Sequence, residues 1–253
     1  MSNSNIYNII LQKKTNGQKA FSVLVDPDNV SLQKMEQIAL NCNEAKVDFL
    51  FIGGSLMVSN QLENCISIFK KNSNIPVLLF PGSPSQVCKN ADALLYLSLL
   101  SGRNPELLIG AHVVSAPIVK ASGLEVIPTS YLVIDGGKAT TVSYMSHSNP
   151  IPADKTDIAV CTAMAGEFQG KKLTYMDAGS GAKNAISNEM INAVSKNTNL
   201  PLIIGGGIRE AEQAYEKSKA GADVIVVGNA IEKNDKLIHE ISAAIHEATI
   251  KIK

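Results

Sequence analysis

Eight short apolar runs, spaced regularly along the chain, constrain the fold more than any other feature of this sequence. Most are continuously hydrophobic rather than alternating, which is typical of parallel strands buried on both faces. Segments with helical spacing of apolar residues separate them. This alternation predicts one TIM (β/α)8 barrel. The runs are Ala20–Asp26, Val47–Gly53, Pro76–Gly82, Ala93–Leu99, Glu125–Asp135, Lys172–Gly179, Leu200–Gly205 and Asp223–Gly228.

No linker rich in Pro or Gly interrupts the alternation, so we expect a single domain over residues 1–253. Residues 1–18 precede the first run and should form an N-terminal helix or lead-in that covers the bottom of the barrel. Ser31 and Ser187 stand where helices should begin, and serine caps helix N-termini well.

Two connections depart from the regular pattern. The one between Gly82 and Ala93 is too short for an ordinary helix and contains Pro84, so we expect a short or missing third helix. The stretch from Gly136 to Ala153 is long and polar, and such loops are usually functional or mobile.

Composition excludes several classes of protein. The 23 basic residues balance the 23 acidic ones, which argues against non-specific binding of nucleic acid. The polar N-terminus has no signal-peptide core, and no apolar run approaches the ~20 residues of a membrane helix. The four cysteines form no C-x-x-C pair, so we expect reduced thiols and a cytoplasmic location.

Glycine-rich segments follow the last two runs, where phosphate commonly binds in such barrels. They are Ile204-Gly205-Gly206-Gly207 and Val227-Gly228-Asn229. Without Cβ atoms the backbone amides can approach phosphate oxygens, and a helix expected directly after each segment adds a positive dipole end. The alternative for the glycines alone is a tight strand-to-helix turn. Arg209 could add a charge to this site or cap the outer helix surface, and we favour the second.

One strand earlier, Tyr175-Met176-Asp177-Ala178-Gly179-Ser180-Gly181 offers amides and a hydroxyl to the same phosphate. Tyr175 and Asp177 are two residues apart and share a face of the strand. We expect both at the mouth of the barrel, because a carboxylate beneath the helices would be buried without a partner. The alternative is that Asp177 only organises its turn.

Across the mouth, Asp26 ends the first run and Ser55 follows the second. A carboxylate beside a hydroxyl suits Mg²⁺, which takes few protein oxygens and completes its shell with water and substrate phosphates. A carboxylate repels an anionic phosphate, so the two can share a site when a metal ion lies between them. The alternative is an Asx turn at Asp26 and a helix cap at Ser55. The sequence thus suggests two anion sites, one held by backbone and one by metal.

These motifs together resemble geranylgeranylglyceryl phosphate synthase over nearly the whole chain. The segments that carry the resemblance are Ser22–Asp28, Phe51–Ser55, Leu79–Ser83, Tyr175–Gly181, Gly205–Arg209 and Val227–Asn229. Phe80-Pro81-Gly82-Ser83 and the Asp26/Ser55 pair are similar to the second of the family's two groups. The resemblance implies a Mg²⁺-dependent prenyltransferase that joins the C3 hydroxyl of sn-glycerol 1-phosphate to geranylgeranyl diphosphate and releases diphosphate.

The resemblance also implies the site residues. Asp26 and Ser55 would ligate Mg²⁺, and Tyr175 through Gly181, with Gly206, Gly207, Gly228 and Asn229, would hold glycerol phosphate. Asp177 and Tyr175 would be the catalytic residues, with the acidic position orienting or deprotonating the reacting hydroxyl. The family often has Glu where this chain has the shorter Asp177, which favours binding of the glycerol hydroxyls over direct proton abstraction. It further implies a homo-oligomer, a dimer or a hexamer, and peripheral contact of the lipid product with a membrane.

Three alternatives to this function stay open at the level of sequence. The donor could be a longer polyprenyl diphosphate, as in a heptaprenylglyceryl phosphate synthase. The chain could instead be a sugar-phosphate isomerase or lyase barrel, or a phosphate-binding barrel without catalysis. We expect the runs Leu95–Leu100 and Ile127–Tyr131 to line an apolar groove for the prenyl tail, which the short third connection leaves open.

Overall fold

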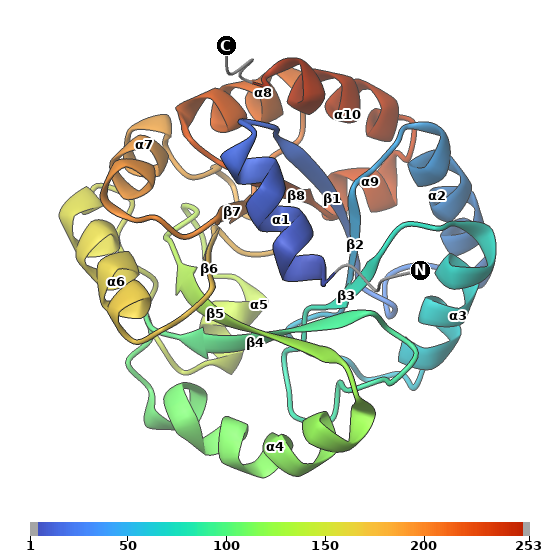
Figure 1. Ribbon diagram of the computed structural model, residues 1–253, viewed down its shortest axis with the longest axis horizontal. Coiled ribbons are helices and arrows are strands. Elements are labelled where there is room, and N and C mark those ends of the chain that lie inside the picture. The colour runs from blue at the N-terminus through green and yellow to red at the C-terminus, as the bar shows by residue number, and fades with distance from the viewer. Residues whose placement is uncertain (1–4, 250–253) are drawn as a thin grey trace.

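The computed structural model describes residues 5–249, and its eight parallel strands close into a barrel in chain order. Figure 1 looks along this barrel, with the helices arranged as a ring around it. The predicted TIM barrel is therefore confirmed, and each strand lies within the run predicted for it. The strands are β1 (Ala20–Val25), β2 (Phe49–Ile52), β3 (Val77–Leu79), β4 (Ala93–Leu99), β5 (Glu125–Val133), β6 (Leu173–Asp177), β7 (Leu202–Gly205) and β8 (Val224–Val227).

The helices cover the outside of the barrel. Ser31 and Ser187 cap α2 and α7 as expected, since each hydroxyl accepts a backbone N–H three residues on. The helices are α1 (Ile6–Thr15), α2 (Leu32–Glu44), α3 (Leu62–Asn72), the π-helical turn η1 (Glu106–Gly110), α4 (Ala111–Ser122), α5 (Thr141–Met145), α6 (Thr156–Phe168), α7 (Asn188–Asn197), α8 (Ala211–Ala220), α9 (Asn229–Lys233) and α10 (Leu237–Glu247).

The helix that normally follows the third strand of such a barrel is missing, as predicted: an irregular segment joins β3 to β4. Strand β3 has three residues, and its register with β4 pairs Leu78 with Ala93 and Leu79 with Leu94. Beyond Leu94, β4 runs on to Leu99 beside β5. The barrel wall is therefore weakest between β3 and β4 on the side of the carboxyl ends, where the substrates of such barrels bind.

Alternation along the strands separates two apolar clusters. One fills the barrel interior and includes Phe51, Leu95 and Tyr175. The other lies between strands and helices and includes Ile52 and Met176. Since successive side chains point to opposite faces, Tyr175 and Asp177 both face the interior.

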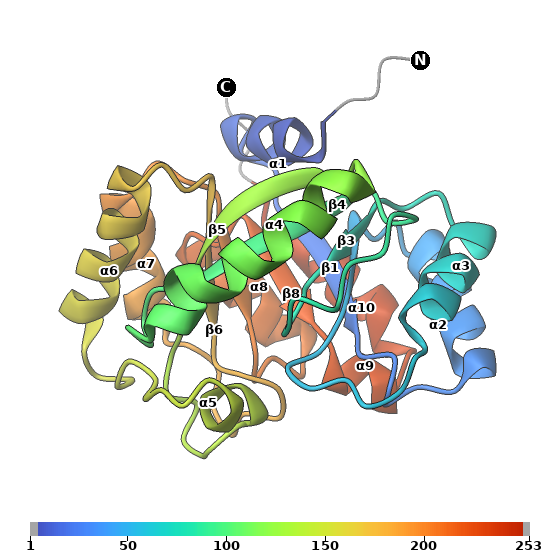
Figure 2. The same ribbon diagram turned by 90° about the horizontal axis from the view of Figure 1, so that it is seen from below.

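Helix α1 lies across the amino-terminal end of the barrel, opposite α5 (Figure 2). The carboxylate of Glu125, at the start of β5, accepts the first amides of α1 from Ile6 (2.5 Å) and Tyr7 (2.9 Å). At the other end of α1, Lys13 pairs with Asp48 at 2.6 Å and Lys14 with Asp223 at 2.9 Å. These contacts place charges favourably at both ends of the helix dipole. Residues 1–4 of the expected lead-in lie outside the described residues.

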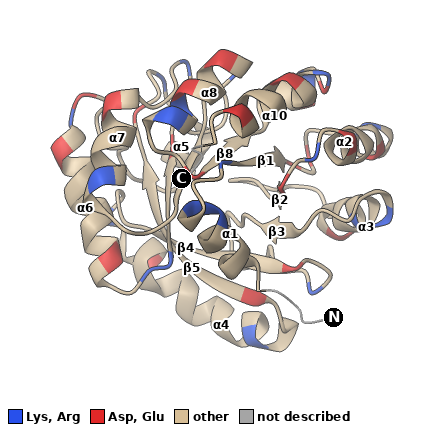
Figure 3. Cartoon of the chain, turned by 45° about the horizontal axis from the view of Figure 1, so that its top comes forward, with Lys and Arg blue, Asp and Glu red and all other residues tan. Residues whose placement is uncertain are grey.

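The long connection after β5 is not entirely irregular, since it contains α5 and returns to the sheet where Ile151 pairs with Ile134. All four cysteines are free, as expected. Charged side chains are spread over the outer helices, whereas α4 carries few of them (Figure 3). Among the described residues, no helix has the length and apolar character needed to cross a bilayer; the cytoplasmic location stays a prediction.

Candidate active site

A cavity of about 800 Å³ lies at the carboxyl ends of the strands. This is within the range of roughly 300–1,000 Å³ that is typical of small-molecule sites. Both halves of the predicted site face it, although they come from opposite ends of the chain. The predicted residues that line this cavity, which we call the mouth, are Asp26, Ser55, Tyr175, Asp177, Ser180, Gly181, Gly206, Gly207, Gly228 and Asn229.

The glycines after β7 leave the strand in a conformation that other residues avoid. Gly206 and Gly207 have φ angles of +81° and +74°, and a Cβ on Gly206 would lie 2.7 Å from the backbone nitrogen of Gly179. The loops after β6 and β7 are therefore in backbone contact. Within the described residues, the amides of Gly206 and Gly207 donate to no protein acceptor. They are available to an anion, as the sequence predicts.

The helices behind these glycines differ from the expectation. Helix α8 begins at Ala211, four residues after Gly207, because Ile208-Arg209-Glu210 intervenes. Helix α9 does begin at Asn229, but it has only five residues. The dipole of a full helix therefore does not point directly at the glycines of β7. The loop amides are the backbone groups that supply positive potential here.

Arg209 does not cover the outer helix surface, which corrects the sequence-based expectation. Its guanidinium donates to the backbone carbonyls of Lys183 (3.1 Å) and Ala182. The partners are backbone oxygens of the preceding βα loop, which no side-chain pattern reveals. Arg209 therefore ties the β7 loop to the β6 loop and holds both around the mouth.

The loop after β6 is also tied to Asn229. The amide oxygen of Asn229 accepts from the hydroxyl of Ser180 (2.8 Å) and from the amide of Gly181 (3.1 Å). Met176 and Ala178 require a correction, because their side chains face the helices and neither lines the mouth. Strand alternation explains this, since Tyr175 and Asp177 take the interior positions. The amide of Ala178 is already used by the carbonyl of Gly205.

Asp177 is 7% exposed and is held on both carboxylate oxygens. It accepts from the hydroxyl of Tyr131 (2.6 Å) and from the amide of Gly179 (2.7 Å). Burial nevertheless raises the pKa of Asp177, because desolvation outweighs these two hydrogen bonds. Each oxygen keeps one acceptor position for a ligand hydroxyl. The bond from Gly179 is the turn contact that the alternative expects, and Asp177 also lines the mouth.

Three aromatic rings fill the space beneath the mouth. Phe80 stacks on Tyr175 with ring centroids 5.0 Å apart, and the edge of Tyr131 meets both rings at 5.7 and 5.6 Å. Such pairs add to the stability of packing. Sequence reasoning placed Tyr131 only among the groove residues and did not anticipate its bond to Asp177, which spans 46 positions.

Asp26 and Ser55 lie on the opposite side of the mouth. The Asp26 carboxylate accepts from the amide of Asp28 (3.0 Å) and the side chain of Asn29 (3.2 Å), so the turn considered as an alternative is present. It also packs over Gly54, where a Cβ would lie 2.6 Å from its Oδ2 atom. Burial is the main cause that raises the pKa of Asp26.

The sequence did not single out Glu232, although it belongs to the same side of the mouth. Its carboxylate accepts the amide of Asp26 at 3.1 Å, and burial, with the nearby Asp26 charge, raises its pKa. Among the described residues no three His, Cys, Asp or Glu side chains form a metal cage. The oxygen donors of Asp26 and Ser55 fit a hard divalent cation that takes its other ligands from water and phosphate.

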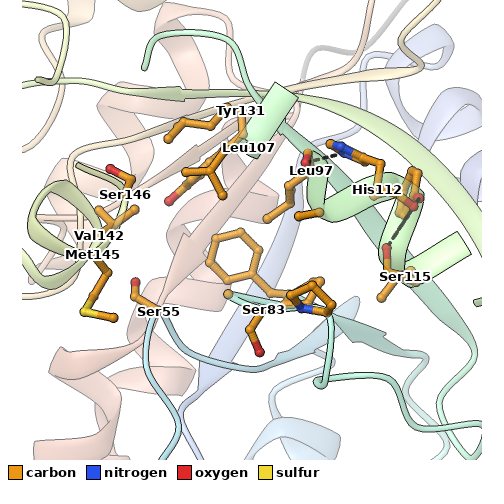
Figure 4. Close-up of a pocket in the computed structure, with 18 of the residues that line it drawn as sticks. Ser55, Ser83, Leu97, Leu107, His112, Ser115, Tyr131, Val142, Met145 and Ser146 are labelled. Carbon is orange, nitrogen blue, oxygen red and sulfur yellow. Dashed lines mark hydrogen bonds between the residues drawn. The ribbon is translucent and has the colours of Figure 1, made fainter. Parts of the chain in front are cut away.

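A second, apolar pocket adjoins the mouth where β3 and β4 separate. It shares Gly54, Ser55 and Phe80 with the mouth and extends beneath α4. Figure 4 shows Ser55 and Met145 on one side of it, and His112 and Ser115 on the other. Of the runs expected here, Tyr96, Leu97, Leu99 and Tyr131 line it. The other residues of those runs do not line it.

Taken together, these features define a phosphate-binding TIM barrel whose polar mouth opens into a long apolar pocket, with carboxylates at one rim and free amides at the other. The PcrB family model matches residues 13–246 of the chain. The chain is 58% identical over 248 residues to a geranylgeranylglyceryl phosphate synthase of Chitinophaga pinensis, covering 98% of each chain. It is 43% identical over 224 residues to that of Thermococcus kodakarensis, covering 88% of each.

Solved structures agree. The crystal structure of (S)-3-O-geranylgeranylglyceryl phosphate synthase from Thermoplasma acidophilum, in complex with sn-glycerol-1-phosphate, superposes with a TM-score of 0.91 at 32% identity. It covers 96% of this chain and 99% of its own. The chain therefore belongs to the PcrB family of geranylgeranylglyceryl phosphate synthases. Tryptophan synthase from Mycobacterium tuberculosis, with a TM-score of 0.61 at 11% identity, shares the fold alone.

Proposed function

We propose that this chain is a prenyltransferase that alkylates the C3 hydroxyl of sn-glycerol 1-phosphate with geranylgeranyl diphosphate and releases diphosphate. The observation that carries the proposal is the junction of the two cavities at Ser55. A donor with its diphosphate at the Asp26 rim can extend its tail directly into the apolar pocket. A sugar-phosphate isomerase has no use for such a pocket, and family membership also argues against that alternative.

Glycerol phosphate is assigned to the late strands. The free amides of Gly206 and Gly207 bind the phosphate, and Gly228, Ser180 and Gly181 complete the cup around it. Asn229 orients Ser180 and Gly181 through the hydrogen bonds described above. This anchor holds the glycerol hydroxyl near the donor carbon, and such positioning contributes much of the rate in two-substrate reactions.

Asp177 accepts a hydrogen bond from a glycerol hydroxyl and thereby orients it. Two observations support binding over direct proton abstraction: its oxygens already accept from Tyr131 and Gly179, and the stacked Tyr175 and Phe80 hold the surrounding wall rigid. The ionised form of Asp177 makes the attacking oxygen more electron-rich. Tyr175 shapes the site beneath the reacting hydroxyl.

Mg²⁺ with ligands Asp26 and Ser55 is part of the proposal. When bound, the ion supplies charge neutralisation to a diphosphate leaving group. Asp26 is held in place by Asp28, Asn29 and the contact with Gly54, so its carboxylate orientation is fixed before any ligand arrives. The apolar walls of the adjoining pocket exclude water from the allylic carbon.

The Asp26→Ala variant tests the division into two anion sites. With sn-glycerol 1-phosphate, geranylgeranyl diphosphate and Mg²⁺, the unmodified protein should release diphosphate, and Asp26→Ala should abolish turnover. Calorimetry should show glycerol phosphate binding within about twofold of the unmodified protein, because the two sites use separate groups. Loss of glycerol phosphate binding in Asp26→Ala contradicts the two-site assignment. Absence of turnover with every donor length contradicts the enzyme proposal.

The length of the donor is open to the same assay, run across prenyl chain lengths and both glycerol phosphate enantiomers. We favour geranylgeranyl diphosphate because the relatives carry that name. A preference for a longer donor would make the chain a heptaprenylglyceryl phosphate synthase with the same chemistry.

We also propose that the chain forms a homo-oligomer. The outer face of α4 supports this, since Val113 and Val114 are 64% and 71% exposed and apolar, and Ile118 is 50% exposed. Contiguous apolar surface of this kind usually marks a contact with protein or lipid. Light scattering with Val114→Glu against the unmodified chain tests it. If the unmodified chain is already a monomer and Val114→Glu has the same mass, the exposed apolar face of α4 argues for peripheral contact with lipid instead.

A further inference from the structure

The sequence offered no obvious cation for the phosphate end of the mouth, yet the structure brings one there. Lys138, from the loop after β5, lines the mouth beside Ser180 and Gly181. Its Nζ atom lies 3.7 Å from the position that a Cβ on Gly181 would occupy. The ammonium group is therefore next to the loop to which we assign the phosphate.

The local sequence explains how Lys138 arrives at this place. Asp135 accepts the amide of Gly137 at 2.8 Å and fixes a turn, and the carbonyl of Gly136 accepts the amide of Asn184 at 2.9 Å. A Cβ on Gly136 would lie 2.8 Å from the carbonyl oxygen of Ala178. Only a residue without a side chain permits this approach. The two glycines thus dock the β5 loop onto the β6 loop.

The ammonium of Lys138 is not neutralised by the protein. Among residues 5–249, no carboxylate oxygen lies within 4.0 Å of its Nζ atom. Arg209 and Lys233 also line the mouth, and the guanidinium of Arg209 donates to the carbonyls of Ala182 and Lys183. Lys138 thus lies beside Gly181 with its ammonium donors available to a ligand.

We propose that Lys138 is a phosphate-binding residue, which donates a charge-assisted hydrogen bond to the phosphate of glycerol 1-phosphate beside Gly181. The inference rests on the proposed function for the identity of the ligand. An ammonium supplies the positive charge that loop amides alone provide only partly, and hydrogen bonds between ionised groups are about twice as strong as neutral ones. Lys138 has no assigned part in the transfer of the prenyl group.

Lys138→Met tests the proposal, with Lys183→Met as the matched control. Lys183 is also exposed and lies in the adjoining loop, but its side chain does not line the mouth. Both variants lose one positive charge, so any general change of potential affects them alike. Lys138→Arg keeps the charge and should keep most of the affinity.

Calorimetric titration with sn-glycerol 1-phosphate, and separately with inorganic phosphate, gives the primary readout. We expect Lys138→Met to weaken glycerol phosphate binding about 5- to 20-fold, because the group is partly solvated. The affinity of this variant should also depend less on salt. Lys183→Met should bind like the unmodified chain.

Steady-state kinetics then assign the ligand. For Lys138→Met we expect KM for glycerol phosphate to rise while KM for the prenyl diphosphate is unchanged. Binding by Lys138→Met within twofold of Lys183→Met overturns the inference, as does a defect confined to the prenyl diphosphate. Failure of the proposed function is a separate result, because it appears as absence of turnover in the unmodified chain, whatever the phosphate titrations show.

Discussion

The bond between Tyr131 and Asp177 allows a quantitative test of how the site works. Tyr131→Phe removes a single hydroxyl, which donates to the Asp177 carboxylate at 2.6 Å, and leaves the aromatic ring in place. A hydrogen bond to a charged group contributes about 1.5–3 kcal/mol. Because this bond favours the ionised carboxylate, its loss should raise the pKa of Asp177 further.

The direction of the effect on activity follows from the charge. If ionised Asp177 accepts the glycerol hydroxyl, kcat/KM for glycerol phosphate falls as the carboxylate becomes protonated at low pH. The acidic limb of the pH profile should therefore move to higher pH in Tyr131→Phe, and kcat/KM measured on that limb should fall about 10- to 150-fold, which is the rate ratio that corresponds to about 1.5–3 kcal/mol. At alkaline pH the two proteins should differ much less.

The same shift affects stability in a defined way. Burial already raises the pKa of Asp177 above its unfolded value, so its stabilising contribution is present below the unfolded pKa and is lost as pH rises through the folded pKa. Tyr131→Phe removes a bond that favours the ionised form. The loss of unfolding free energy should therefore be greater above the folded pKa than below the unfolded one, and urea titrations at several pH values measure it.

Tyr96→Phe is the matched control. It also removes a tyrosine hydroxyl, which donates to the carbonyl of His112 at 2.7 Å, away from Asp177. Its pH profile should coincide with that of the unmodified chain. An acidic limb that moves equally in both variants, or in neither, refutes the reasoning that the ionisation of Asp177 governs activity through Tyr131.

Three further predictions concern other parts of the molecule. Gly206→Ala should weaken glycerol phosphate binding at least about tenfold and lower the unfolding free energy in urea by about 1–2 kcal/mol. Gly170 has a φ of +80° and open space around it, so the control variant Gly170→Ala should affect stability alone. Ser115→Phe fills the pocket beneath α4, so product analysis with donors of different length should show a shift to shorter tails. Glu125→Gln removes the charge at the start of α1 and should lower the unfolding free energy by about 0.5–1 kcal/mol without changing KM.

Much of the fold follows from local sequence because buried parallel strands must be apolar on both faces. All eight runs contained a strand, although β3 kept only three residues, Val77–Leu79. The absence of a helix after β3 also followed from the sequence, because the connection between Gly82 and Ala93 is short and contains Pro84. Chain order then fixes which strand ends share the mouth, so Asp26, Asp177 and Gly206 could be placed together without coordinates.

The parts of the site that the sequence did not predict are contacts between residues that come together when the barrel closes. Tyr131 reaches Asp177 from the neighbouring strand, and Glu232 reaches the amide of Asp26 across the point where β8 meets β1. Neither pair has a sequence spacing that reveals it. Arg209 was misjudged because its partners are backbone carbonyls. Lys138 was not anticipated because the packing of two glycines brings its loop to the mouth.

The two sides of the mouth differ in how they can treat an anion. The late-strand side presents free amides and Lys138, so it attracts phosphate as it stands. The early-strand side presents the carboxylates of Asp26 and Glu232, and burial is the main cause that raises the pKa of both. A diphosphate is repelled there unless a cation accompanies it. Glycerol phosphate binding should therefore be independent of divalent ions, whereas binding of the prenyl diphosphate should require them.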